Sequence, residues 1–264
     1  MNNLWFHVKI TKRKGRIFMN EKVVLITGGA KGIGASIVKK MAENNYNVVI
    51  NYLTSESEAN NLKKELENLY GIKVMLIQTD VSKEEDVKNM VHSIINEFGH
   101  IDCLVNNASI APGNYFQDKT VLEFQSVLNT NLLGTFLTSK YVGMEMLKQK
   151  SGRIINISST NAIDTNETYS MDYDASKAGI ISLTHNFAKA LAPYVLVNAV
   201  APGWTSTEAV LEMNPTYLKE EEKKCLLERF AKPEEIANVV AFLASDDASY
   251  INSSVIRVDG GLKC

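Results

Sequence analysis

The sequence predicts an α/β fold in which helices cover both faces of a doubly wound, seven-stranded parallel sheet. Seven short runs rich in Val, Ile and Leu alternate with helical patterns along the chain. Most of the runs are continuously apolar, as strands buried on both faces are. A glycine-rich turn joins the first run to a helical pattern, and neither a repeat nor a linker divides the 264 residues. We therefore expect a single domain.

The expected strands are the apolar runs themselves: Val23–Thr27, Asn47–Asn51, Val74–Gln78, Cys103–Asn106, Arg153–Ile157, Leu196–Val200 and Val255–Val258. Strands that alternate with helices form parallel sheets, and ligands bind at the carboxyl ends of such strands.

Start signals mark two of the helices. Ser82-Lys83-Glu84-Glu85 has the pattern of a capping box and predicts a helix that runs to about Phe98. Pro233 followed by two glutamates suits the first turn of a helix through Leu243.

Two stretches interrupt the alternation. Residues 161–172 are polar and predict a loop, whereas Thr205–Lys232 favours two short amphipathic helices that form a mobile flap. Both follow strands, so we expect them at the carboxyl edge of the sheet, where a substrate would lie.

The glycine turn reads Thr27-Gly28-Gly29-Ala30-Lys31-Gly32-Ile33-Gly34. Glycines let the chain turn tightly and let backbone N–H groups approach a phosphate, and the start of the next helix adds about half a positive charge. A glycine-rich loop alone is weak evidence, but its place between a buried strand and a helix predicts a site for a dinucleotide pyrophosphate.

Composition excludes several classes of function. The net charge is −2, with 45% hydrophobic and 22% charged residues, which gives no reason to expect nucleic acid or an anionic membrane as a partner. No apolar run approaches the ~20 residues of a membrane span. Three cysteines and four histidines are scattered without ligand spacing, so we expect no metal site and a reducing, cytoplasmic location.

Residues 1–18 stand apart from the rest of the chain. They carry five basic residues and no acid, and a Leu4-Trp5-Phe6 cluster precedes the charges, which is the reverse of a secretory signal. We expect a disordered, dispensable extension, with translation beginning naturally at Met19 and a catalytic domain over 19–264. A basic tail that binds an anionic partner is the alternative.

Tyr173 and Lys177 lie four residues apart, on one face of a predicted helix. A neighbouring cation favours the phenolate and lowers the pKa of a tyrosine, which makes the pair usable for proton transfer. Ser158 and Ser159 end the fifth strand, where a hydroxyl could hold a carbonyl oxygen. Asn131 lies in a predicted helix, a position that its propensity disfavours.

These motifs, in this order, resemble the short-chain dehydrogenase/reductase family over residues 21–262, with the nearest likeness to 3-oxoacyl-[acyl-carrier-protein] reductases. The resemblance implies a Rossmann-type domain in which Ser159 positions a carbonyl and Tyr173 transfers the proton. It implies that Lys177 lowers the Tyr173 pKa and holds the nicotinamide ribose, and that Asn131 orders a water relay. Ser159 is preferred to Ser158 because the family's serine is usually the second of such a pair.

The resemblance also extends the cofactor site beyond the glycine turn. It implies that Asp80 and Val81 lie beside the adenine, and that Pro202, Gly203 and Thr207 hold the nicotinamide carboxamide. The complete set of expected cofactor residues is Thr27, Gly28, Lys31, Gly32, Ile33, Gly34, Asn51, Tyr52, Thr54, Ser55, Asp80, Val81, Asn107, Ala108, Tyr173, Lys177, Pro202, Gly203 and Thr207. Ser109 departs from the family's usual Asn-Asn-Ala-Gly, which alters the wall near the adenine ribose.

We expect NADP(H) to be preferred, with NAD(H) usable. An NAD site usually has an acid about 20 residues past the glycine turn. The segment Asn51-Tyr52-Leu53-Thr54-Ser55 holds no carboxylate, and Lys31 offers a cation to a 2′-phosphate.

The expected reaction is the reversible reduction of a carbonyl to an alcohol by hydride transfer, with a small ketone or aldehyde as substrate. Acids at Asp164, Glu167, Asp172 and Asp174 would repel an acidic carrier protein, and the turn Ala192-Pro193-Tyr194 is uncharged, although Lys150 is basic. A 3-oxoacyl-[acyl-carrier-protein] reductase is the alternative. An inactive cofactor-binding sensor and a hydrolase with Ser159 as nucleophile are remoter ones.

The resemblance further implies a homotetramer or dimer. The long helical patterns at Glu123–Gln149 and Ser176–Ala192 would pair between subunits.

Overall fold

Seven parallel strands form one sheet in the computed structural model, which describes residues 11–13, 16–18, 22–164 and 167–262. The strands are β3 (Val23–Ile26), β4 (Asn47–Tyr52), β5 (Val74–Gln78), β6 (Cys103–Asn106), β7 (Gly152–Ile157), β8 (Val195–Pro202) and β9 (Val255–Val258). They lie in the order β5-β4-β3-β6-β7-β8-β9, and every neighbouring pair is parallel. All seven expected strands and the predicted fold class are confirmed. The order reverses between β3 and β6, which opens a crevice at their carboxyl ends.

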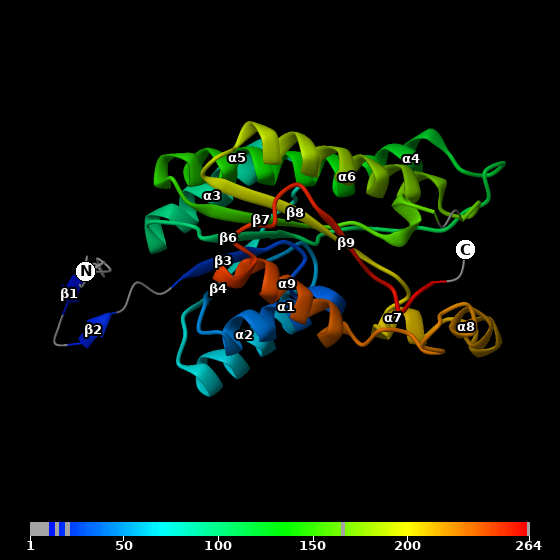
Figure 1. Ribbon diagram of the computed structural model, residues 1–264, viewed down its shortest axis with the longest axis horizontal. Coiled ribbons are helices and arrows are strands. Elements are labelled where there is room, and N and C mark those ends of the chain that lie inside the picture. The colour runs from blue at the N-terminus through cyan, green and yellow to red at the C-terminus, as the bar shows by residue number, and fades with distance from the viewer. Residues whose placement is uncertain (1–10, 14–15, 19–21, 165–166, 263–264) are drawn as a thin grey trace, which may run out of the picture.

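Helices cover both faces of this sheet (Figure 1). They are α1 (Gly32–Glu43), α2 (Glu56–Tyr70), α3 (Glu84–Phe98), α4 (Val121–Val127), α5 (Gly134–Gln149), α6 (Met171–Ala190), α7 (Glu208–Leu211), α8 (Pro215–Glu222) and α9 (Pro233–Ala244). Helices α1, α2 and α9 share one hydrophobic core with the sheet, and α3, α5 and α6 share the other.

Helical periodicity explains how each helix covers the sheet. Helix α3 buries Val87, Met90, Val91 and Ile94, which recur at the spacing of one helix face. Burying a side chain of this size stabilises the fold by roughly 1.5–3 kcal/mol. The strands that these helices cover are buried on both faces, which explains their continuously apolar sequences.

The expected capping box at Ser82 is wrong. Helix α3 begins at Glu84, and the backbone N–H and hydroxyl of Ser82 both donate to Asp80 Oδ1, at 2.9 and 2.7 Å. Asp80 therefore uses the Ser82 hydroxyl in a turn before the helix starts. A true capping box opens α4, where Thr120 and Glu123 satisfy each other's backbone N–H groups.

The predicted helix at Glu123–Gln149 contains an irregularity. Helices α4 and α5 are joined without a break by a π-helical segment, Leu128–Leu133. Such segments are rare and often mark functional sites, and this one contains Asn131.

The N-terminal extension is partly described. Thr11–Arg13 (β1) pairs with Arg16–Phe18 (β2) in a separate two-stranded antiparallel sheet, where we had expected disorder. Residues 1–10, 14–15 and 19–21 lie outside the described part of the chain.

The segment between β8 and α9 contains α7 and α8, as expected for a flap of two short helices. It extends beyond the carboxyl end of the sheet (Figure 1). Trp204 anchors it by stacking on Phe230, with ring centres 5.5 Å apart, and by an edge contact with Tyr217 of α8. The Trp204 indole N–H also donates to Glu221 Oε2 at 3.2 Å.

Candidate active site

The glycine turn connects β3 to α1 by a path that only glycine can follow. Gly28 has φ +61°, and a Cβ there would lie 2.9 Å from the Ala108 Cα. A Cβ on Gly34 would lie 2.2 Å from the Gly28 carbonyl oxygen. The turn therefore brings backbone N–H groups and the start of α1 to the carboxyl edge of β3, where an anion can bind.

Thr27, Asn107 and Asn51 brace this turn. The Thr27 hydroxyl accepts from the N–H groups of Asn107 and Ala108, at 3.0 Å each, and Asn107 Nδ2 donates to the carbonyls of Thr27 and Gly28. Buried Asn51 accepts from the Gly28 N–H and donates to the Thr79 carbonyl. These three expected cofactor residues therefore hold the turn between β4 and β6.

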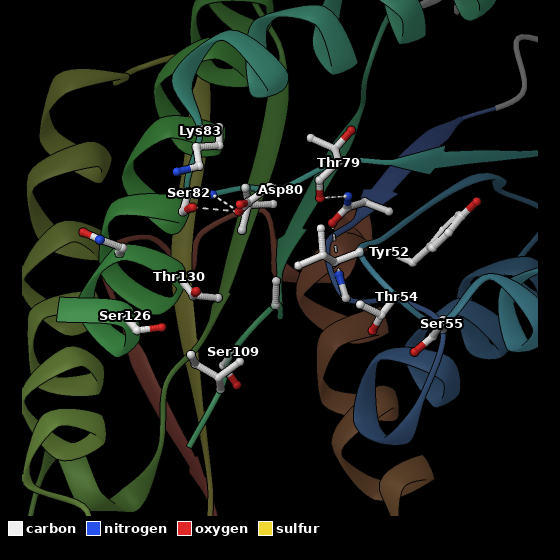
Figure 2. A pocket seen from close by; sticks show the side chains of 18 of the residues that line it. Tyr52, Thr54, Ser55, Thr79, Asp80, Ser82, Lys83, Ser109, Ser126 and Thr130 are labelled. Atoms are coloured by element: carbon white, nitrogen blue, oxygen red, sulfur yellow. Dashed lines mark hydrogen bonds between the residues drawn. The ribbon is translucent and has the colours of Figure 1, made fainter. Parts of the chain in front are cut away.

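A pocket of about 630 Å³ opens beside the turn. Nine expected cofactor residues line it, namely Gly28, Lys31, Asn51, Tyr52, Thr54, Ser55, Asp80, Val81 and Ala108. Figure 2 shows Thr54 and Ser55 on one side of the pocket, with Ser126 and Thr130 facing them from the other.

The wall of the pocket that holds Ser126 and Thr130 was not predicted from the sequence. Leu122, Gln125, Ser126, Asn129 and Thr130 recur at intervals of three and four residues, so their helical spacing was the signal available.

Lys31 lies at the edge of this pocket and is already paired with an acid. Its amino group is 2.7 Å from Glu58 Oε1, on the first turn of α2. The hydrogen bond with Glu58 raises the pKa of Lys31, and the same bond lowers the pKa of Glu58. The cation expected to meet a 2′-phosphate therefore has a competing carboxylate beside it.

Gly32, Ile33 and Gly34 form the first turn of α1, and Thr207 lies against that turn. A Cβ on Gly32 would lie 3.4 Å from Thr207 Cγ2. Pro202 ends β8, and the Gly203 N–H donates to the Val258 carbonyl at 3.0 Å. The start of the flap therefore lies next to the glycine turn, and the binding of the nicotinamide end by these residues stays a prediction.

Tyr173 and Lys177 come together on α6, as their spacing predicts. The Lys177 amino group is 5.3 Å from the centre of the Tyr173 ring and donates to the Ile157 carbonyl at 2.8 Å. Lys177 is only 2% exposed. The Lys177 amino group bonds to Ile157, the last residue of β7, so Tyr173 and Lys177 lie at the carboxyl end of that strand.

Burial controls the protonation of both side chains. It raises the pKa of Tyr173, although a hydrogen bond with Ser159 opposes the change and Asp174 adds to it. Burial also lowers the pKa of Lys177 to about 7. Burial is the largest influence on the Tyr173 pKa, and a role for Lys177 in lowering that pKa stays a prediction.

The two serines that end β7 have different partners. The Ser158 hydroxyl donates to the Lys177 carbonyl at 2.9 Å, so it fixes α6 to the strand. Ser159 bonds to Tyr173 and accepts from the Asn161 N–H at 3.2 Å. Ser159 is therefore the serine placed next to the phenol.

Asn131 is fully buried, and its side chain joins two elements. It accepts from the Ile110 N–H at 2.8 Å and donates to the Ile110 carbonyl at 2.9 Å and to Ser176 Oγ at 3.0 Å. The loop after β6 is thus tied to α6. The water relay remains a prediction.

The acids beside the site are largely neutralised or bonded. Asp172 pairs with Lys119, and Asp164 pairs with Arg257. Asp174 accepts from the Asn161 side chain and from the Glu167 N–H. The negative field that we expected from this loop is therefore weaker than its sequence suggests.

Within residues 22–164 and 167–262 and the two N-terminal strands, His, Cys, Asp and Glu form no cluster of three that could hold a metal. Burial raises the pKa of Cys103 to about 12, so this thiol is a poor nucleophile. None of the described helices is long and apolar enough to cross a membrane.

Comparison with known proteins agrees with this arrangement. A family model described as enoyl-(acyl carrier protein) reductase matches residues 28–263. A 3-oxoacyl-[acyl-carrier-protein] reductase of Aquifex aeolicus is 40% identical over 247 residues, covering 93% of this chain and 99% of the relative. A Staphylococcus epidermidis protein of the same name is 38% identical over 91% of this chain and 98% of the relative. An uncharacterized oxidoreductase of Thermotoga maritima is 36% identical over 91% of this chain and 95% of the relative.

The braced glycine turn, the Ser159–Tyr173–Lys177 cluster and these full-length matches lead to one conclusion. The chain belongs to the short-chain dehydrogenase/reductase family and is an oxidoreductase that uses a nicotinamide cofactor to act on carbonyl and hydroxyl groups.

Proposed function

We propose that the protein reduces a carbonyl compound to an alcohol with NADPH, and that Ser159, Tyr173, Lys177 and Asn131 carry the reaction. The observation that supports this most is the state of Tyr173. It is half-buried, hydrogen-bonded to Ser159 and four residues from Lys177 on α6, and its raised pKa leaves the phenol protonated at neutral pH. A protonated phenol is the form that a proton donor needs when a carbonyl is reduced.

The described residues fit a nicotinamide dinucleotide. Gly28 and Gly34 have no side chain where a Cβ would collide with backbone or with the Asn107 amide, so the turn can pack tightly and present its N–H groups to a phosphate. The pocket beside the turn is large enough for a nucleoside. Asp80 and Val81 would contact the adenine, and Thr207 would contact the nicotinamide end. The bound cofactor supplies the hydride, and all other chemistry falls to the protein.

The protein's own steps follow from its contacts. The Ser159 hydroxyl holds the carbonyl oxygen next to the Tyr173 phenol, which donates its proton to that oxygen. The Lys177 amine, fixed by the Ile157 carbonyl, lies one helical turn behind the phenol and holds the ribose. Asn131 fixes α6 against the loop after β6 and completes the relay that returns a proton to Tyr173.

NADPH is the proposed cofactor because the end of β4 offers hydroxyls at Thr54 and Ser55 and no carboxylate, while Lys31 lies at the pocket edge. NADH remains usable, because Glu58 competes for Lys31. The test is to measure kcat/KM for both cofactors with ethyl acetoacetate as substrate. A clear advantage for NADPH supports the proposal, and equal values contradict it.

A small free ketone or aldehyde is the proposed substrate, since the turn at residues 192–194 offers no positive charge to an acidic carrier. A 3-oxoacyl-[acyl-carrier-protein] reductase is a second candidate, which the names of the relatives and the neutralised acids at Asp164 and Asp172 favour. Comparing kcat/KM for acetoacetyl-carrier protein with a panel of ketones decides between them. A much higher value for the carrier substrate would overturn our preference.

We also propose a homotetramer with a cytoplasmic location. Helix α5 presents Phe136, Met144 and Leu147, each more than a third exposed. Phe136 packs beside Phe187 of α6, with ring centres 6.0 Å apart. Exposed apolar side chains along a long helix are suited to pairing with a second subunit.

A further inference from the structure

A buried ion pair lies one residue from Tyr173. The Lys119 amino group is 2.9 Å from both carboxylate oxygens of Asp172 and donates to the Pro112 carbonyl at the same distance. The Lys119 side chain is 7% exposed and the Asp172 side chain is 0% exposed. Both charges have therefore left water, which is costly unless each is fully paired.

The pair acts on the backbone of Tyr173. Helix α6 begins at Met171, so the Tyr173 N–H belongs to its first turn, where no helical carbonyl can accept it. Asp172 Oδ1 accepts this N–H at 3.0 Å. Lys119 bonds to both oxygens of that carboxylate and so fixes its orientation toward the Tyr173 N–H. The first turn of α6, which carries the phenol, is thereby held in place.

The same pair joins the loop after β6 to the start of α6. Lys119 belongs to the loop between β6 and α4, and the loop between β7 and α6 ends just before Asp172. The Asn114 N–H donates to the Tyr169 carbonyl at 3.0 Å, and the Tyr115 and Tyr169 rings meet edge to face with centres 5.1 Å apart. Three contacts therefore join these segments: the Asn114–Tyr169 hydrogen bond, the Tyr115–Tyr169 ring contact and the Lys119–Asp172 ion pair. The ion pair is charged and buried.

We propose that Lys119 and Asp172 are positioning residues that set the Tyr173 phenol against Ser159 by fixing the first turn of α6 to the loop after β6. This inference rests on the proposed role of Tyr173. A small displacement of a reacting group can reduce turnover by about a hundredfold, so a contact that fixes the helix start affects kcat more than cofactor binding.

The test compares Lys119→Met, Asp172→Asn, the double variant and Lys119→Arg with the wild type. Lys119→Met leaves a buried carboxylate without its partner and should lower kcat for ethyl acetoacetate by at least about tenfold. The Kd for NADPH, measured by fluorescence titration, should change little. The double variant removes both charges, so its kcat should fall less than that of Lys119→Met. Lys119→Arg keeps the positive charge and should retain most of the wild-type kcat. Lys39→Met, which removes an exposed cation paired with Glu65 on the other face of the sheet, is the control.

A second readout does not depend on turnover. Amide hydrogen exchange at residues 167–176 should be faster in Lys119→Met than in the wild type, with little change elsewhere, whereas general destabilisation would speed exchange throughout the molecule. The inference is overturned if Lys119→Met keeps kcat within about twofold of the control, or if exchange rises evenly over the chain. If the wild type reduces no carbonyl compound, the proposed function fails, and the pattern of exchange still decides whether the pair fixes this helix.

Discussion

Tyr173 and Lys177 show how burial can change the proton affinity of two neighbouring side chains. Burial favours the neutral form of each group, so the phenol keeps its proton and the amine partly loses its own. The sequence placed the two residues on one helix face correctly. It could not show that burial would raise the pKa of the phenol, because burial depends on the packing of the whole fold.

Tyr173→Phe should reduce kcat by about 10²- to 10⁴-fold, because it removes the proton donor and leaves the ring in place. The Kd for NADPH should stay close to that of the wild type. Turnover is followed by NADPH consumption and affinity by fluorescence titration. Tyr70→Phe, at the end of α2 and far from Ser159 in the fold, is the matched control. A variant at Tyr173 that keeps a substantial fraction of kcat would refute the assigned mechanism.

Lys177→Met should stabilise the protein at low pH. The pKa of this lysine falls from 10.5 to about 7 on folding, so the unfolded chain binds the proton more tightly. The cost of burying it is fully present below about pH 7 and disappears as the pH rises toward about 10.5. At about pH 6 the free energy of unfolding should exceed that of the wild type by on the order of 2–4 kcal/mol.

Urea denaturation across this pH range measures the difference between the two proteins. The difference in the free energy of unfolding between Lys177→Met and the wild type should decrease as the pH rises. A gap that stays constant from acid to alkaline pH would mean that Lys177 has an ordinary pKa in the folded protein.

At the scale of elements, we expect the Lys31–Glu58 pair, between the starts of α1 and α2, to influence the choice of cofactor. Glu58→Gln removes the carboxylate that holds Lys31, so Lys31 becomes free to meet a 2′-phosphate. Because the pair is exposed, the effect should be modest, a decrease of about two- to fivefold in the Kd for NADPH. The Kd for NADH should not change.

Glu65→Gln breaks a similar exposed pair with Lys39, farther along α2, and serves as the control for the charge change. Titrations at low and high salt should show the effect of Glu58→Gln weakening as salt screens the charges. Equal changes in affinity for both cofactors would rule out a role in selecting the 2′-phosphate.

The elements also show what the sequence could and could not predict. The strands were placed because continuous burial leaves a simple apolar signature, and the glycine turn because close backbone contacts demand glycine. The capping box at Ser82 failed because a nearby aspartate competed for the same hydroxyl. The Asn131 side chain and the Lys119–Asp172 pair join residues distant in sequence, so no local sequence pattern predicts these contacts.

At the scale of the whole molecule, the outer face of α5 and α6 should hold subunits together. Phe136→Glu puts a charge into this apolar surface and should produce a smaller species at micromolar concentration. Light scattering measures the mass. Leu69→Glu, on an exposed position of α2, is the control and should leave the mass unchanged. A wild-type protein that is monomeric under these conditions would contradict the proposed assembly.

The motif residues come together in the structure as the sequence predicts, and their roles stay predictions, whereas the walls around them were only partly predicted. Thr27 and Asn107 were expected to contact the cofactor, yet their hydrogen bonds hold the glycine turn in shape. The surface of α4 that faces the pocket was missed, because its residues fit an ordinary amphipathic helix. Only the fold places that helix opposite Thr54 and Ser55.

The stack of Trp204 on Phe230 gives the flap a built-in optical signal. The chain has two tryptophans, and the other is Trp5, within the N-terminal extension. A protein that starts at Met19 would therefore contain one indole, located where α8 joins the rest of the molecule. Its emission would respond to any movement of Tyr217 or Glu221 and would be quenched by reduced nicotinamide nearby, so the opening and closing of the flap could be timed without an attached dye.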